Sequence, residues 1–190
     1  MKPQNSTLTS KLAAPVTLAL LAVIWLIYII QLITGVSALS PSSNALLAWG
    51  GSVATLSLTT EPWRLFTNIF VHAGLMHILA NSYMLFLIGN TIEYKYGKLS
   101  TLLLYLTGGV VASLASAVWR SFHIETIRYT PSAFGVQESV AFNHTVSVGA
   151  SGAIMALSGA LLVAFWSRQS ASQSRELSAT DRAMRNALIQ

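Results

Sequence analysis

The sequence predicts an all-α membrane protein with four transmembrane helices, and three observations lead to this fold class. Of its 190 residues, 53% are hydrophobic and 9% are charged, whereas a soluble domain carries about 25% charged residues. The mean hydropathy is +0.59. The apolar residues are gathered into four segments, at residues 12–33, 76–92, 99–119 and 150–166. Residues 1–190 are therefore expected to form a single membrane domain.

The four segments differ in length. A helix needs roughly 20 residues to cross a hydrocarbon core, so 12–33 and 99–119 are long enough, whereas 76–92 and 150–166 are short. The first segment follows Lys2 and Lys11 and in this respect looks like a secretory signal. Its apolar run exceeds the ~7–15 residues of a signal core, so a retained anchor is expected.

The charges predict how the chain is oriented. With residues 1–11 and the tail 167–190 in the cytoplasm, eight of the eleven basic residues lie inside, and Arg64, Arg120 and Arg128 lie outside. Membrane proteins follow this positive-inside pattern, which accounts for the net charge of +5 without a nucleic-acid partner. We expect a multi-pass protein of a bacterial cell membrane, because the N-terminus carries no long Arg-rich transit segment.

Two long connections lie on the outer side, at residues 36–75 and 120–149. The first contains the stretch WRLFTNIFVHAGLM, whose aromatic and aliphatic residues prefer the membrane interface. The first outer loop is therefore expected to be partly embedded.

Three polar residues are expected to meet near the outer end of the bundle. His77 and Asn81 are four residues apart and share one face of a helix, and Ser151 begins the fourth span. Spans two and four both run from outside to inside, which places the three residues at comparable depth. From Ser151 to Trp166 there is only roughly 24 Å of helix. We therefore expect the serine to lie in a depression that water enters.

The available side chains limit the chemistry. The chain has no cysteine, which excludes disulfides and cysteine nucleophiles. His72 and His77 lack the i, i+4 spacing of a zinc pair, so no metal is predicted. A serine becomes a nucleophile with a base and with hydrogen-bond donors for the oxyanion. His77, Asn81 and the N–H groups that begin the fourth span could donate. The sequence GASGA does not fit the G-x-S-x-G elbow of soluble hydrolases.

Helix packing gives a second account of the same residues. Closely packed membrane helices carry faces of small residues, and such faces occur in two of the spans: Gly108, Gly109, Ala112, Ser113 and Ser116 in one, and Gly152, Ala156, Gly159 and Ala160 in the other. On this alternative Ser151 serves packing, and His77 and Asn81 form an interhelical hydrogen bond. Strongly polar groups in lipid are nevertheless candidates for function, and here three of them converge.

Taken in order, these features resemble the rhomboid family of intramembrane serine proteases. The resemblance covers roughly residues 63–159, and its matching features are Trp63-Arg64, HAGLMHILAN from His72 to Asn81, GNTIEYKYG with Glu93 and Gly97, Tyr105, and GASGA around Ser151. It implies a rhomboid-like helical bundle and a serine-type endopeptidase without metal or cofactor. The enzyme would cleave transmembrane segments of partner proteins in the lipid bilayer through an acyl-enzyme at Ser151, with His77 and Asn81 stabilising the oxyanion.

The resemblance also implies structural roles. Trp63 and Arg64 would shape the embedded loop and influence lateral entry of the substrate, and Glu93 would be a structural hydrogen-bonding residue. The glycines expected to be structural are Gly97, Gly149, Gly152 and Gly159.

One part of the family pattern is not found. Family members take their general base from a histidine two spans after the serine, and the last histidine here is His144. With four spans where the family core has six, the sequence is expected to lack the last two helices. His144 could fold back as a substitute base. The alternative function is a catalytically inactive rhomboid-like protein that binds transmembrane clients.

Overall fold

The computed structural model describes residues 14–122, 125–132, 135–142 and 145–188. Within this part, four helices are long and apolar enough to cross a membrane: α1 (Pro15–Ile33), α5 (Leu75–Tyr96), α6 (Lys98–Ser121) and the stretch Ser151–Ser172 of α7 (Ser151–Leu188). The predicted fold class is confirmed. The chain divides into two compact units, Met1–Leu157 and Ser158–Gln190, and the contacts that build the site lie within the first.

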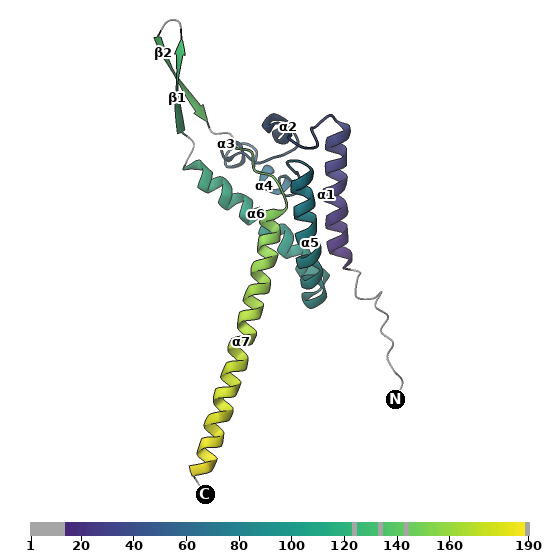
Figure 1. The fold of residues 1–190 in the computed structure, drawn as a ribbon, viewed down its shortest axis with the longest axis vertical. Helices are drawn as coiled ribbons and strands as arrows, with labels where there is room; N and C mark the ends of the chain where they lie inside the picture. Colours follow the sequence, from purple (N-terminus) through teal and green to yellow (C-terminus); the bar gives the residue numbers. More distant parts are fainter. Residues whose placement is uncertain (1–13, 123–124, 133–134, 143–144, 189–190) are drawn as a thin grey trace. The chain divides into compact units, whose positions relative to one another are not determined.

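A carboxylate near the end of α5 caps the start of α1, and the two helices run side by side (Figure 1). Glu93 accepts hydrogen bonds from the backbone N–H groups of Val16 and Thr17, at 2.9 and 2.8 Å, and from the Thr17 hydroxyl at 2.9 Å. The first N–H groups of a helix have no partner within it. Pro15 occupies the first helical position, which suits a residue without an N–H.

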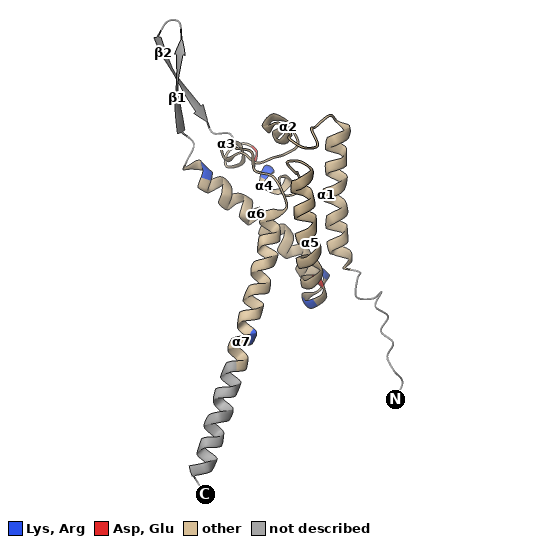
Figure 2. Cartoon of the chain, in the orientation of Figure 1, with Lys and Arg blue, Asp and Glu red and all other residues tan. Residues whose placement is uncertain are grey.

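A single glycine joins α5 to α6. Gly97 has φ +86°, a conformation that residues with a Cβ rarely adopt. In the first unit the charged residues of the helices occur near the helix ends, and the apolar middles carry none (Figure 2). This is the distribution expected of helices that cross hydrocarbon.

Small residues allow α6 and α7 to approach closely. A Cβ added at Gly108 would collide with the Cβ of Ala156, and one added at Gly152 would lie 2.7 Å from the Cβ of Ala112. These contacts join the small-residue faces of the two helices, the arrangement that membrane helices favour. Gly159 belongs to the second unit, and its role in packing stays a prediction.

The fourth span was predicted at residues 150–166, and the helix that contains it is longer than this span. The helix does not stop at Trp166 but continues to Leu188, because the polar residues beyond Trp166 include good helix formers and no glycine or proline. Likewise α5 continues beyond residue 92, to Tyr96. Since α7 is not short, its length no longer argues for a recessed Ser151, and the position of the serine has to be derived from its contacts.

The two outer loops have different structures. The first contains three short helices, α2 (Ser43–Ala48), α3 (Ala54–Ser57) and α4 (Arg64–Thr67), of which α3 and α4 pack against α6. The second carries an antiparallel hairpin of β1 (Glu125–Ser132) and β2 (Gly135–Phe142), in which Arg128 pairs with Ser139. The hairpin was not predicted, and the embedding of the first loop stays a prediction.

Candidate active site

The chain enters α7 through a glycine that lies against His77 and Asn81. Gly149 has φ +111°, and a Cβ there would lie 2.6 Å from Cε1 of His77, 2.7 Å from its Nε2 and 3.2 Å from Nδ2 of Asn81. Both the positive φ and the close approach require glycine. Ser151, two residues later, is the first residue of the helix. The backbone that precedes the serine is therefore held beside both polar residues of α5.

The hydrogen bonds of His77 determine which of its nitrogens can donate. The backbone N–H of Ala73 donates to Nδ1 of His77 at 3.3 Å, so the neutral ring carries its proton on Nε2. That atom is the one beside Gly149. Asn81 is only 7% exposed, and within the described residues its Nδ2 has no hydrogen-bond partner. Two side-chain donors are thus available next to the segment that leads to Ser151.

A pocket of about 460 Å³ opens beside the serine. Ser151 and His77 both line it, together with Asn68, Ser113, Arg120 and Gly149. No hydrogen bond joins Ser151 to His77, both of which the structure describes. The N–H groups in the first turn of α7 add further donors, because the start of a helix leaves them without intrahelical acceptors. The arrangement can hold a carbonyl oxygen on which negative charge develops.

The first outer loop holds the segment that leads into α7. Ser52 and Ser147 form a two-way backbone bridge, with N···O distances of 2.9 and 2.7 Å. The N–H of Gly149 donates to the carbonyl of Asn68 at 2.8 Å. Three backbone hydrogen bonds therefore join this loop to the four residues immediately before Ser151.

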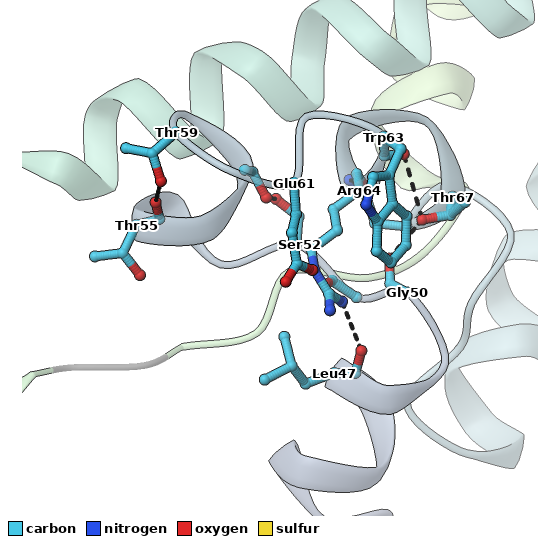
Figure 3. A network of polar contacts seen from close by, with 12 residues as sticks. Leu47, Gly50, Ser52, Thr55, Thr59, Glu61, Trp63, Arg64 and Thr67 are labelled. Atoms are coloured by element: carbon cyan, nitrogen blue, oxygen red, sulfur yellow. Dashed lines mark hydrogen bonds and ion pairs between the residues drawn. The ribbon is translucent and has the colours of Figure 1, made fainter.

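The Trp63-Arg64 pair holds the loop together from within. Nη1 of Arg64 donates to the carbonyls of Leu47 and Gly51, at 2.6 and 3.0 Å, and Nε donates to Glu61 (Figure 3). The guanidinium lies 4.4 Å from the centre of the Trp63 ring, a cation–π contact. Arg64 thereby orders residues 47–51, which lead directly to the bridge at Ser52.

A second histidine lies behind His77. The ring of His72, which precedes α5 and is 1% exposed, lies 5.2 Å from that of His77, and its Nδ1 is 3.1 Å from the carbonyl of Phe70. Burial, together with the nearby His77, lowers the pKa of His72 to about 4. His72 is therefore neutral near pH 7 and supports the neighbouring ring.

The remaining candidate residues are placed as follows. Tyr105 is fully buried on α6, with its ring 6.3 Å from that of Phe70, and is not among the residues that line the pocket. Among the described residues no group of three or more His, Asp and Glu side chains is arranged to hold a metal ion. His144, the suggested substitute base, lies outside the described residues.

Sequence reasoning missed Asn68. This residue is 3% exposed and lines the pocket, and its carbonyl accepts the Gly149 N–H. Its only signal in the sequence is a polar residue inside the apolar stretch WRLFTNIFVHAGLM, which does not reveal contacts with distant segments.

Comparisons with known proteins relate the chain to one family. Residues 59–178 match the model of the Rhomboid domain. The chain is 32% identical over 152 residues to Rhomboid protease AarA of Providencia stuartii, covering 80% of this chain and 51% of that protein. It is 34% identical over 123 residues to Rhomboid protease GluP of Bacillus subtilis, covering 65% of this chain and 20% of that protein.

A third relative is RHOMBOID-like protein 1 of Arabidopsis thaliana, which is 36% identical over 126 residues, covering 65% of this chain and 26% of that protein. The chain thus spans about half the length of AarA and less of the other two. The domain match covers more than half of the chain and includes every residue of the pocket. The chain therefore belongs to the rhomboid family and is an integral, multi-pass membrane protein.

Proposed function

We propose that Ser151 is the nucleophile of an intramembrane serine endopeptidase that cleaves transmembrane segments of other membrane proteins. The observation that carries the proposal is the contact of Gly149 with His77 and Asn81, which puts hydrogen-bond donors beside the start of α7. The names of AarA and GluP as rhomboid proteases support the same class of activity.

The proposed reaction is acyl transfer to serine. The hydroxyl oxygen of Ser151 attacks the carbonyl carbon of the scissile peptide bond, and its proton passes to a base. Nε2–H of His77, Nδ2 of Asn81 and the first N–H groups of α7 stabilise the oxyanion. The base then gives this proton to the peptide nitrogen, which leaves as an amine when its bond to the carbonyl carbon breaks. Water, giving up a proton to the base, attacks the ester, and the base returns the proton to the oxygen of Ser151 as the acid is released. Oxyanion donors of this kind contribute about 3–4 kcal/mol each to the lowering of a barrier.

Neither of the two histidines that the structure describes is suited to accept the proton of Ser151. His77 is unsuited to this role, because its Nδ1 accepts from Ala73 and its Nε2 carries the proton. His72 is equally unsuited, because it is buried and its Nδ1 lies at the carbonyl of Phe70. A histidine on a later helix, as the family pattern implies, fits the reaction best.

The surroundings of the site complete the proposal. Residues 1–11 and 167–190 lie in the cytoplasm of a bacterial cell, and the first outer loop with Trp63 and Arg64 borders the path by which a substrate enters from the bilayer. The positive-inside distribution of charge supports this orientation.

The experiment uses the product of the complete natural reading frame, co-expressed with a single-span reporter. Ser151→Ala is expected to abolish cleavage. Ser167→Ala, which removes an exposed hydroxyl bonded within α7 to the carbonyl of Ala164, is expected to cleave like wild type. Cleavage that persists unchanged in Ser151→Ala would overturn the assignment of the nucleophile. A wild-type protein that binds the reporter without cleaving it would favour the inactive, client-binding alternative.

A further inference from the structure

We propose that Asn68 is a positioning residue that sets the place of Ser151 by joining the first outer loop, α6 and the entry to α7. The inference rests on the proposed function of Ser151 as nucleophile. It concerns a residue outside the Trp63-Arg64, histidine–asparagine and GASGA motifs.

Three segments of the chain meet at this one side chain and its carbonyl. Oδ1 of Asn68 accepts a hydrogen bond from the hydroxyl of Ser113 on α6, at 2.9 Å. Nδ2 donates to the carbonyl of Arg64 at 2.6 Å, and the backbone carbonyl of Asn68 accepts the N–H of Gly149 at 2.8 Å. Each of these three hydrogen bonds uses a different polar group of Asn68. The two side-chain bonds therefore limit the positions that the backbone carbonyl can take.

Burial makes these bonds hard to replace. Asn68 and Ser113 are 3% and 8% exposed, and a buried polar group left unpaired carries the cost of its desolvation. The two side-chain bonds therefore fix the orientation of the asparagine, and with it the direction of the carbonyl that holds Gly149.

The position of Gly149 matters for the chemistry because it brings the backbone against His77 and Asn81. A shift of the Asn68 carbonyl would move Gly149, and with it Ser151 and the first N–H groups of α7, relative to those donors. Misplacement of a reacting group by about 1 Å can reduce a rate on the order of 100-fold. The loss is expected in kcat, because the bonds position the nucleophile and do not bind substrate.

The first test compares the kinetics of four proteins, each expressed from the complete natural reading frame. Ser113→Ala removes the hydroxyl that donates to Oδ1 of Asn68 with little change in shape, and Ser113→Thr keeps a hydroxyl at this position. Thr107→Ala is the matched control, because it removes an exposed hydroxyl of α6 that bonds to the carbonyl of Leu103. We expect Ser113→Ala to lower kcat about tenfold with KM within about twofold, and Ser113→Thr and Thr107→Ala to stay near wild type.

The second test reports the position of residue 151 without requiring activity. Residues 1–190 contain no cysteine, so Ser151→Cys introduces the only thiol among them. Its rate of modification by a water-soluble maleimide depends on its exposure and surroundings, and is followed on the peptide that contains residue 151. Adding Asn68→Ala or Ser113→Ala to Ser151→Cys is expected to change this rate at least about threefold, whereas adding Thr107→Ala leaves it unchanged.

The two tests separate the two claims. If wild type and Ser151→Ala cleave equally, the proposed function fails, and the thiol rates still decide whether Asn68 positions residue 151. If Ser113→Ala leaves both kcat and the thiol rate within about twofold of their controls, or if Thr107→Ala has the same effect as Ser113→Ala, the positioning role is overturned.

Discussion

The backbone of Gly149 lies so close to the imidazole of His77 that a methyl group on residue 149 would be 2.7 Å from Nε2. This relationship puts the start of α7 and the donors of α5 in one place, and it leads to the first prediction.

Gly149→Ala is expected to destabilise the protein by roughly 2–5 kcal/mol, because the strain of a positive φ and the overlap with His77 add together. Gly35→Ala is the matched control, since Gly35 has φ +88° and an added Cβ there meets nothing within 4 Å. Its cost should be about 1–2 kcal/mol, from backbone conformation alone. Unfolding in mixed micelles measures both variants, and equal costs would contradict the close contact.

Glu93→Gln is expected to lower the free energy of unfolding by about 2–3 kcal/mol, because the buried carboxylate accepts three hydrogen bonds at the start of α1. Thr17→Val removes one of the three donors while keeping the shape of the side chain, and should cost about 1 kcal/mol. Thermal unfolding in detergent compares the stabilities of the two variants and wild type. A Gln variant as stable as wild type would show that the carboxylate does not support α1.

His72 should make stability fall in mildly acidic solution. Its pKa is lowered from 6.5 to about 4 in the folded state, so between these values the unfolded chain binds more protons and stability rises with pH. The contribution of neutral His72 to the free energy of unfolding is complete above about pH 6.5, and roughly 3 kcal/mol of it is lost as the pH approaches 4. His72→Gln should lack this component, so that its stability curve diverges from that of wild type across the window. Parallel curves would exclude a buried neutral His72.

The contact of Gly108 with Ala156 should show compensation. Gly108→Ala is expected to cost about 1–3 kcal/mol, because the two Cβ atoms would collide. Adding Ala156→Gly removes the obstructing methyl group and should recover most of this loss. A double-mutant cycle measures the coupling, and strictly additive effects would mean that α6 and α7 do not meet there.

Local patterns in the sequence predicted the helices but not what positions their ends. Long apolar runs predict spans directly, and the i, i+4 spacing of His77 and Asn81 places them on one face of α5. The cap that Glu93 places on Thr17 joins residues 76 positions apart, and the Asn68–Gly149 bond likewise links distant segments. Such pairings depend on tertiary packing and leave no periodic signal. Apolar runs likewise locate the fourth span but not the end of α7, because polar residues beyond Trp166 are good helix formers and continue the helix.

The central claim is that Ser151 is a nucleophile beside an oxyanion site, and covalent labelling tests it most directly. The protein from the complete natural reading frame would be treated with a fluorophosphonate in its own membrane, and the site of modification would be located by peptide mass. The account predicts one adduct, on Ser151, formed several-fold more slowly in Asn81→Ala and lost in Ser151→Ala. Absence of an adduct from the folded wild-type protein, or an adduct that persists in Ser151→Ala, would contradict it.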